Sequence, residues 1–525
     1  MESVEKLQYP TGTRRAIIVI TAISAALLQL IDTSIVNVSL REISGSIGAS
    51  TQEIAWTVTS YAISNVIMIP LSGMMSNLFG RKRYFTISIL LFTVASLFCG
   101  MATSLWGLVL WRFIQGIGGG ALLTISQTII VEAYPPEKVS IANAIFGVGV
   151  ILGPTFGPTL GGYLTDNYSW HWIFFINIPI GLIAAYLSWT NVTDSKGARK
   201  PRKIDWAGII LLVLAVGSLQ FVLEEGISKD WFASKEIIIL SMVAVIGLVG
   251  FIWREWTYEF AAVNIKLLKN WNLAMGSILN FIVGMILLAT VFVFPLFVQI
   301  GLGWTATMTG NFMIPGALAS AVSMAIVGQL LTRGYNAKMI MLLGTIMVFA
   351  FAFIMSFSSP DSTESSFFWP FILRGLGIGF MLSPVMSLSL QGLKGIDIPQ
   401  GAGLSNMIRQ LGGAVGIAVM NVMLLHRNAA NDNSLLQHAN IYNETFQDRV
   451  SSLTQNFVSQ GYFIDDARQI AYRVIDLTIF KQQSLVSYDN IFWIVAVAVL
   501  CCIPVILLIR NNKSAGLPKV DVHLD

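Results

Sequence analysis

Residues 16–40 have the sequence AIIVITAISAALLQLIDTSIVNVSL, an apolar run with a single charged residue, Asp32. A helix that crosses the hydrocarbon core of a bilayer needs about 20 mostly apolar residues, so this run is long enough to cross. Arg14 and Arg15 precede it, as basic residues precede a signal peptide. The run is longer than a signal peptide and has no clear small-residue cleavage site. We therefore interpret it as a retained first transmembrane helix.

The same length criterion predicts fourteen transmembrane helices along the 525 residues. Only 11% of the residues are charged and 55% are hydrophobic, whereas a soluble domain carries roughly 25% charged residues. The predicted fold class is an all-α polytopic membrane protein, and the small net charge of +4 does not indicate nucleic-acid binding. The helices are expected at residues 16–40, 53–76, 84–103, 105–131, 140–163, 171–190, 206–224, 236–254, 271–300, 306–331, 338–358, 367–391, 398–425 and 488–510.

Lysine and arginine lie mostly on one side of this map. If the N-terminus is in the cytoplasm, the short loops on the opposite side carry only Arg41, Lys229 and Lys235. Cytoplasmic loops carry an excess of Lys and Arg, so we expect a multi-pass protein with both termini in the cytoplasm. The cytoplasmic set is Lys6, Arg14, Arg15, Arg81, Lys82, Arg83, Lys138, Lys196, Arg199, Lys200, Arg202, Lys203, Arg254, Lys266, Lys269, Arg333, Lys338, Lys394, Arg510, Lys513 and Lys519.

Two short motifs recur at similar distances along the chain. GMMSNLFGR at 73–81 resembles GQLLTRG at 328–334, and QGIG at 115–118 resembles RGLG at 374–377, with offsets of 255 and 259 residues. Parallel repeats around a central site are a transporter architecture. We expect two six-helix halves plus two inserted helices. The expected domains are an N-terminal half at 1–195, the inserted helices with their flanking loops at 196–265, and a C-terminal half at 266–525.

Residues 426–487 are polar and lie between the last two predicted transmembrane helices, on the side opposite the termini. Helices are expected at 443–458 and 465–480, because these stretches lack Gly and Pro and space their apolar residues by three and four. A connection of this length is far beyond the ordinary range, which favours a functional segment or a small subdomain. A solvated spacer is the alternative.

Few charged residues fall deep inside the predicted helices. They are Asp32, Arg112, Arg374 and Arg409, and Asp32 is the only acidic one. At 1.5 Å per residue, Asp32 and Arg112 both lie roughly 12 Å below the outer surface, so they are at matching depth. Burial disfavours a charged carboxyl and a nearby arginine favours it, so Asp32 is suited to load and release a proton. We predict Asp32 and Arg112 as a proton-coupling pair, with a static ion pair as the alternative.

The predicted fifth helix contains GVILGPTFGPTLGG at 149–162. Its glycine stripe, defined as Gly149, Gly153, Gly157 and Gly161, recurs every fourth residue and so lies on one face of a helix. Pro158 and Gly162 complete the motif. Small residues let two helices approach closely. The stripe therefore predicts a tight helix contact or, compatibly, a contact and hinge between the two halves.

Five motifs in the first 180 residues together resemble the EmrB-like family, the fourteen-span drug:proton antiporters of the major facilitator superfamily. They are LIDTSIVNV at 30–38, similar to L-D-x-T-I-V-N-V; Gly73, Asn77, Gly80, Arg81 and Lys82, similar to G-x-x-x-D-R-x-G-R-[RK]; R-x-x-Q-G at Arg112, Gln115 and Gly116; G-x-x-x-G-x-x-x-G-P-x-x-G-G at 149–162; and WHWIFFINIP at 170–179, similar to W-R-W-I-F-x-I-N-x-P.

Two of the motifs depart from the family pattern, at three positions. Asn77 and Leu78 replace an aspartate and an arginine in the cytoplasmic loop motif. In the family this loop stabilises the state closed to the cytoplasm through charge pairs, and the departure implies a weaker role here. His171 replaces an arginine; a histidine can titrate near physiological pH, but we expect a packing role.

The resemblance implies a secondary active transporter rather than an enzyme. It implies a proton-coupled antiporter of the cell inner membrane that exports hydrophobic or amphipathic drugs and gives antibiotic resistance. The proton gradient would drive export, with no cofactor and no metal. The resemblance also implies a tripartite efflux pump with an EmrA-like periplasmic membrane-fusion adaptor and a TolC-like outer-membrane channel. Residues 426–487 would then be the docking surface.

Two alternatives stay open. The first is a dedicated proton-coupled exporter of a fatty acid, lipid or siderophore. The second is a membrane sensor or lipid-modifying enzyme, which the sequence disfavours because it contains no intramembrane acid pair and its histidines are scattered. The histidines are His171, His426, His438 and His523.

A multidrug pocket needs apolar, adaptable walls and a few polar groups. For each apolar candidate, packing against lipid or a neighbouring helix is the alternative. Arg374, Arg409 and Gln410 would suit an anionic head group such as that of a fatty acid, although Arg374 could equally be structural. The candidates are Gln29, Trp56, Gln115, Gln127, Asn280, Phe292, Phe294, Met313, Arg374, Phe380, Met381, Arg409 and Gln410.

Overall fold

A computed structural model describes residues 9–135, 138–194, 204–258, 263–360, 362–393, 397–436 and 443–509. Within them, fourteen helical segments are long and apolar enough to cross a membrane, which is the predicted number. The helices are α1 (Gly12–Ile47), α2 (Thr51–Phe79), α3 (Arg81–Gly100), α4 (Leu105–Glu132), α5 (Val139–Asn167), α6 (Trp172–Phe175), α7 (Asn177–Asn191), α8 (Trp206–Glu225), α9 (Lys235–Thr257), α10 (Trp271–Leu296), α11 (Ala306–Thr332), α12 (Ala337–Met355), α13 (Glu364–Ser389), α14 (Asp397–Leu436), α15 (Glu444–Ser459), α16 (Ile464–Leu500) and α17 (Cys502–Leu508).

Local sequence explains where several helices begin and end. α2 begins with a capping box, in which the Ser50 hydroxyl accepts from the Glu53 N–H and the Glu53 carboxylate accepts from the Ser50 N–H. The sixth transmembrane segment is divided at Ile176 into α6 and α7. Pro179 explains the division, because its ring removes an N–H donor and clashes with the carbonyl four residues earlier.

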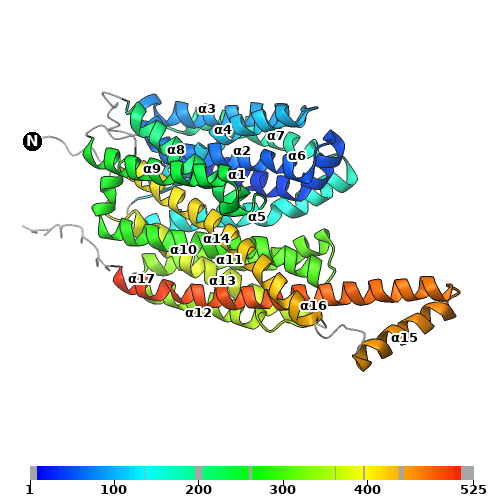
Figure 1. Cartoon of the computed structure of the whole chain (residues 1–525). Helices are drawn as coiled ribbons and strands as arrows, with labels where there is room; N and C mark the ends of the chain where they lie inside the picture. The colour runs from blue at the N-terminus through cyan, green and yellow to red at the C-terminus, as the bar shows by residue number, and fades with distance from the viewer. Residues whose placement is uncertain are drawn as a thin grey trace, which may run out of the picture.

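The bundle has two halves that lie side by side, with their long helices running in roughly the same direction (Figure 1). Helices α1–α7 form one half, and α10–α14 with α16 and α17 form the other. Helix α8 packs against both α2 and α14, and α9 packs on α8. The inserted pair therefore covers the line where the two halves meet, next to α2 and α14.

The first expected domain boundary, between residues 195 and 196, lies outside the described residues. Residues 195–203, with Lys196, Arg199, Lys200, Arg202 and Lys203 of the predicted cytoplasmic set, lie outside the described residues, as do Lys6, Lys394, Arg510, Lys513, Lys519, His438 and His523. The second boundary, at residue 265, falls at the start of a short 3-10 helix, Ile265–Lys269. The two inserted helices lie between these points, at α8 and α9.

The repeat noted in the sequence has a backbone counterpart. Gly80 follows α2 with φ +85°, and Gly334 follows α11 with the same φ. This left-handed conformation is easily reached only by glycine, because it has no Cβ. A glycine with this φ therefore follows the second helix of each half, directly after α2 and one residue further on after α11.

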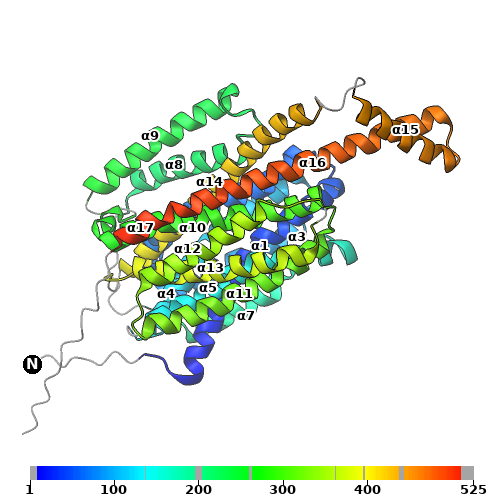
Figure 2. The ribbon, with the colours of Figure 1, turned by 90° about the horizontal axis from the view of Figure 1, so that it is seen from below.

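The segment between the last two membrane crossings forms a helical hairpin that projects from one end of the bundle (Figure 2). α15 confirms the helix predicted at 443–458. The helix predicted at 465–480 also forms, but it is not separate from the last membrane crossing, since α16 is continuous from Ile464 to Leu500. Residue 487, where the polar segment was expected to end, lies inside this continuous helix, because no glycine or proline interrupts residues 465–500.

The two halves contact each other mainly along two helix pairs, α5 with α11 and α2 with α14. Along α5 and α11, a Cβ on Gly310 would lie 2.5 Å from Thr159 Oγ1, and one on Gly328 would lie 2.8 Å from Ala144 Cβ. These contacts lie near opposite ends of both helices. Between α2 and α14, a Cβ on Gly73 would lie 3.1 Å from Gln400 Cα, near the end of α14 that is remote from the hairpin. The two halves are therefore tightly packed on each other in this conformation.

Candidate proton-coupling site and central cavity

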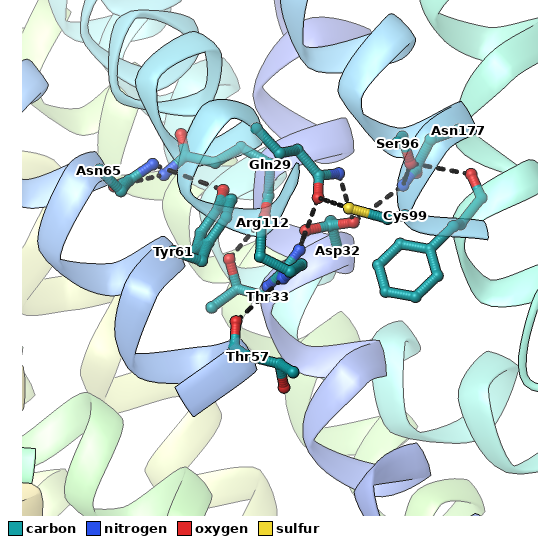
Figure 3. Close-up of polar contacts among 12 residues, drawn as sticks. Gln29, Asp32, Thr33, Thr57, Tyr61, Asn65, Ser96, Cys99, Arg112 and Asn177 are labelled. Atoms are coloured by element: carbon teal, nitrogen blue, oxygen red, sulfur yellow. Dashed lines mark hydrogen bonds and ion pairs between the residues drawn. The ribbon is translucent and has the colours of Figure 1, made fainter. Parts of the chain in front are cut away.

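The carboxylate of Asp32, in the middle of α1, is held by three donors from two other helices (Figure 3). Oδ2 accepts from Arg112 Nη1 at 2.5 Å. Oδ1 accepts from Gln115 Nε2 and from Asn177 Nδ2, both at 2.9 Å. The ion pair expected from the matching depth of Asp32 and Arg112 therefore forms, and two neutral amides reinforce it.

Arg112, in α4, is held on several sides. Its Nε donates to the Thr57 carbonyl of α2 at 3.2 Å, and Nη1 also donates to Gln115 Oε1 at 2.8 Å. Its guanidinium lies 4.2 Å from the centre of the Tyr61 ring, close enough for a cation–π interaction. The fixed position of the guanidinium means that Asp32 cannot move without disturbing α2 and α4.

Helix α7 contributes a residue to this site, and the sequence analysis did not predict that role. Asn177 is the first residue of α7, directly after the break caused by Pro179, and its amide also donates to Ser96 Oγ of α3 at 3.1 Å. The available signal was a lone asparagine within the apolar run WIFFINIP. A buried polar group inside a membrane helix needs a partner, and here Asp32 is that partner.

The site is sealed inside the first half. Asp32 is 0% exposed and Arg112 is 1% exposed, so neither side chain faces lipid. Gln29, one helical turn before Asp32, donates to Asn65 Oδ1 at 3.3 Å, and Asn65 donates to the Tyr61 hydroxyl at 3.4 Å. A row of polar side chains therefore runs from Gln29 to the ring that covers Arg112 (Figure 3).

Two of the substrate candidates join the halves instead of lining an open pocket. Arg409 in α14 donates to Asn406 Oδ1 at 2.9 Å, and Asn406 donates to Gln127 Oε1 of α4 at 2.8 Å. Gln127 in turn donates to Asn143 Oδ1 of α5 at 3.2 Å. This polar chain of four residues crosses from the second half to the first.

Other candidates pack within one half or against the inserted helices. Trp56 lies 5.3 Å from the Phe221 ring of α8, so it faces the inserted pair. Asn280 donates to Ser405 Oγ within the second half at 2.8 Å. Phe380 and Met381 pack α13 on Gly344 of α12. Phe294 and Met313 belong to the buried apolar core, and Phe292 and Gln410 are partly buried.

The cytoplasmic loop motif makes charge contacts within the first half. Arg81 forms an ion pair with Glu132 at the end of α4. Asp194 accepts from the Lys82 N–H at 2.9 Å and lies against Gly80, and the Lys82 ammonium is 4.8 Å from the Trp189 ring centre. Asn77 is buried, on the turn of α2 that follows the contact between Gly73 and α14.

The glycine stripe of α5 packs on α1. A Cβ on Gly153 would lie 2.4 Å from Leu30 Cβ, and one on Gly161 would lie 2.9 Å from the Ile35 carbonyl oxygen. The tight helix contact that the stripe predicts is present, and in this conformation its partner is α1 of the same half, not a helix of the second half. The spacing of the glycines determines which face of the helix lacks side chains, whereas the helix that packs on that face depends on the tertiary arrangement. Pro158 lies inside α5, and a Cβ on Gly162 would meet nothing within 4 Å.

His171 has a packing role, as expected. Its ring stacks on Trp170 at 3.8 Å between centroids, and Nδ1 lies 2.7 Å from Ser169 Oγ. Partial burial lowers the pKa of His171 below its ordinary value, because it disfavours the charged imidazolium.

A small cavity lies where the halves meet. It has a volume of about 20 Å³ and is lined by α5 of the first half and by α10, α11 and α13 of the second. Apolar side chains such as Ile151, Leu287 and Val291 line it, together with Ser320 and Arg374. A cavity of this size holds about one water molecule. This cavity is therefore too small for a drug-sized molecule in this conformation.

Comparison with known proteins agrees with this architecture. The family model described as Major Facilitator Superfamily matches residues 22–417. The multidrug export protein EmrB of Haemophilus influenzae is 34% identical, with 94% of this chain and 96% of that protein covered. The fatty acid resistance protein FarB of Neisseria gonorrhoeae is 30% identical, with 97% and 99% covered.

A solved structure supports the fold. The human organic anion transporter MFSD10 (TETRAN) superposes with a TM-score of 0.57 at 11% identity, covering 93% of this chain and 100% of that one. At this identity the likeness concerns the fold alone. The fourteen apolar helices, the two packed halves and the family model lead to one assignment: the chain belongs to the Major Facilitator Superfamily of membrane transporters.

Proposed function

We propose that this transporter exports hydrophobic or amphipathic compounds in exchange for protons, and that Asp32 and Arg112 couple the two movements. The observation that carries the proposal is the Asp32 carboxylate, which is fully buried and receives three hydrogen bonds, one of them from a buried arginine. Ionisable residues inside membrane helices mark ion pathways more often than they serve packing alone.

The geometry supports a specific coupling step. Three donors contact the carboxylate in this conformation, and one of them belongs to a buried arginine. Adding a proton to Asp32 would neutralise the partner of Arg112 and remove one acceptor. Protonation would therefore favour a conformation in which α1 and α4 are arranged differently. A proton and a conformational change that alter each other's free energy in this way are coupled.

The driving force is sufficient for useful export. One elementary charge that crosses a membrane potential of 100 mV releases about 2.3 kcal/mol, to which a pH gradient adds. A difference of 1.4 kcal/mol is a tenfold concentration ratio, so a single proton per cycle can sustain a substantial gradient of substrate. No cofactor is needed for this exchange.

We further propose an inner-membrane location with both termini in the cytoplasm. The positive residues near the membrane support this orientation, and the hairpin of α15 and α16 projects from the end opposite the chain's first described residues (Figure 2). The hairpin would then lie in the periplasm, where an adaptor of the EmrA type and a channel of the TolC type could complete a tripartite pump.

Transport in liposomes tests the proposed function. The full chain is reconstituted, a pH gradient is imposed, and efflux of cationic, neutral and anionic lipophilic probes is measured for the unmodified chain and for Asp32→Asn. We expect the variant to lose pH-driven transport while it retains exchange of labelled for unlabelled substrate, which needs no proton. Asp166→Asn is the matched control, because Asp166 is an exposed carboxylate at the end of α5.

Two results would count against the proposal. Undiminished pH-driven transport by Asp32→Asn would remove Asp32 from the coupling step. Absence of pH-driven transport of every probe by the unmodified chain would remove proton exchange itself. If Asp32→Asn folds poorly, the double variant Asp32→Asn, Arg112→Gln takes its place, since it leaves no unpaired charge.

A further inference from the structure

Arg374 of α13 is a buried cation with too few partners. Its side chain is 6% exposed, and none of the ion pairs among the described residues includes it. Its Nε donates to Thr290 Oγ1 at 3.0 Å, while Nη2 is buried without a hydrogen-bond partner. A buried charge without a counter-ion is costly, so this guanidinium is suited to receive an anion.

The repeat shows how this imbalance arises. Thr290 lies 258 positions after Asp32, and Arg374 lies 259 positions after Gln115. The two pairs make equivalent contacts. Gln115 Nε2 donates to Asp32 Oδ1, and Arg374 Nε donates to Thr290 Oγ1. In the first half the carboxylate lies on α1 and an amide donates to it. In the second half the acceptor is a neutral hydroxyl and the donor carries a charge. The second half therefore has a cation where the first half has a balanced pair.

The position of Arg374 makes an anion site accessible during transport. Arg112 is enclosed within the first half, whereas Arg374 lines the central cavity between α5 and the second half. The Phe371 and Phe351 rings lie 5.2 and 6.0 Å from its guanidinium carbon, which fixes the cation without neutralising it. Because both halves line the cavity, any motion that separates them enlarges it around this guanidinium.

The rest of the cavity lining suits an amphipathic ligand. Ile151, Leu287, Val291 and Ile378 are apolar, and Arg374 is the one charged residue among those that line the cavity in the described part of the chain. A carboxylate can take two parallel hydrogen bonds from a guanidinium, while an apolar tail would lie along the aliphatic side chains.

We propose that Arg374 binds the acidic head group of the exported compound, so that lipophilic carboxylates are a preferred substrate class. The proposal rests on the proposed export function, and it adds the site and the charge of the substrate. In the conformation described, the cavity accepts only a water-sized group, so the tail enters when the halves separate. A free inorganic anion such as chloride has the same charge as a carboxylate, so the test must distinguish binding of chloride from binding of a lipophilic carboxylate.

Binding to the full chain in lipid nanodiscs tests the proposal. The probes are dodecanoate, its neutral methyl ester, dodecyltrimethylammonium and sodium chloride, each added to the unmodified chain, Arg374→Gln, Arg374→Lys and the control Arg449→Gln. Arg449 is an exposed arginine of α15. We expect Arg374→Gln to bind dodecanoate at least about tenfold more weakly, and the ester with less than about twofold change. Arg374→Lys should retain part of the preference, because it keeps the charge but not the bidentate geometry.

Thermal unfolding without ligand separates a binding role from a structural one. Removing an uncompensated buried charge should leave the melting temperature of Arg374→Gln unchanged or raise it, while the shift caused by dodecanoate disappears. Loss of stability in Arg374→Gln with unchanged affinity for dodecanoate would overturn the proposal. So would an equal loss of affinity for the carboxylate and its ester.

The remaining outcomes are also decisive. A chloride-dependent rise in melting temperature that Arg374→Gln abolishes, with dodecanoate binding unchanged, would assign an inorganic anion and overturn the substrate proposal. Failure of the export function would appear differently, as loss of pH-driven transport for every probe. Failure of this inference alone would leave transport intact and remove only the preference for the carboxylate over its ester.

Discussion

At the scale of single residues, the Asp32 site replaces water with protein donors. A carboxylate that is 0% exposed has lost its hydration, and Arg112, Gln115 and Asn177 take the place of water around it. Arg112 depends on Asp32 in the same way, because the Thr57 carbonyl and the Tyr61 ring carry no net negative charge. Neither charge is stable in this position without the other.

This dependence predicts unequal costs for neutralising the two residues. Asp32→Asn leaves a guanidinium that cannot lose its proton, so we expect a loss of about 3–5 kcal/mol in unfolding free energy. Arg112→Gln leaves a carboxyl that can take up a proton and become neutral, so its cost should be smaller. The double variant should recover most of the loss. Thermal unfolding of the purified variants in detergent measures the whole cycle.

Gln115 and Asn177 remain in all three variants, so they provide the same amide donors throughout the cycle. Additive losses in the double variant would show that the two charges are independent, which contradicts the geometry. A larger loss of stability for Arg112→Gln than for Asp32→Asn would contradict this order. It would show that an unpaired carboxylate destabilises the site more than an unpaired guanidinium does.

At the scale of helices, the close approach of α1 and α5 places the site. Leu30 and Ile35 of α1 lie against Gly153 and Gly161 of α5, on either side of Asp32 in the sequence. Helices that share small residues at their interface can approach closely and gain van der Waals contact. The stripe therefore fixes the depth and rotation of α1, and with them the direction of the Asp32 side chain.

Two glycines of the same helix give a matched test of this contact. The Cβ of Gly153→Ala would lie 2.4 Å from Leu30 Cβ, which is bonded to backbone and cannot rotate away, so we expect a loss of about 1–3 kcal/mol. Gly162→Ala meets nothing within 4 Å and should be neutral or gain up to about 1 kcal/mol, because alanine favours a helix. Thermal unfolding compares the two. Equal effects of both substitutions would mean that α1 and α5 do not pack as described.

The sequence predicted some of these elements and not others, for physical reasons. Fourteen membrane crossings follow from length and apolarity, because lipid imposes the same requirement on every helix. The pairing of Asp32 with Arg112 follows from depth, which depends only on distance along each helix. The partner of a helix face does not follow from its own sequence, so the contact between Trp56 and α8 could not be predicted from the residues around Trp56. The continuity of α16 was missed because its polar outer part and its apolar part were interpreted as two separate helices.

At the scale of the whole molecule, the two halves repeat a backbone plan but carry different charges. The first half encloses a carboxylate and an arginine that neutralise each other, and the second half presents Arg374 to the cavity between them. The polar chain from Arg409 through Asn406 to Gln127 joins the halves without an ion pair. The hydrogen bond that crosses between the halves, from Asn406 to Gln127, joins two neutral amides and costs roughly 1 kcal/mol to break, which suits an interface that must open in every cycle.

The hairpin lies outside this transport unit, which predicts that the two can be separated. Residues 437–478 would be replaced by a short Gly/Ser linker that joins α14 to the remainder of α16. The joint is feasible because the two helices already lie side by side near it, where Asn431 donates to Ser487 Oγ and Gln483 donates to the Asn428 carbonyl, both at 3.0 Å. We expect pH-driven transport in liposomes to be retained and drug resistance of the native host to be lost.

The tip of the hairpin gives the reason for this difference. Phe463 is 83% exposed and Ile464 is 67% exposed, and large apolar residues exposed at a projecting tip are typical of a surface that another protein covers. The double substitution Phe463→Asp, Ile464→Asp keeps the hairpin and should lower resistance without changing transport in liposomes. If resistance survives both the excision and the double substitution, the hairpin is not a docking surface, and the transporter delivers its substrate to the far side of the membrane without an adaptor.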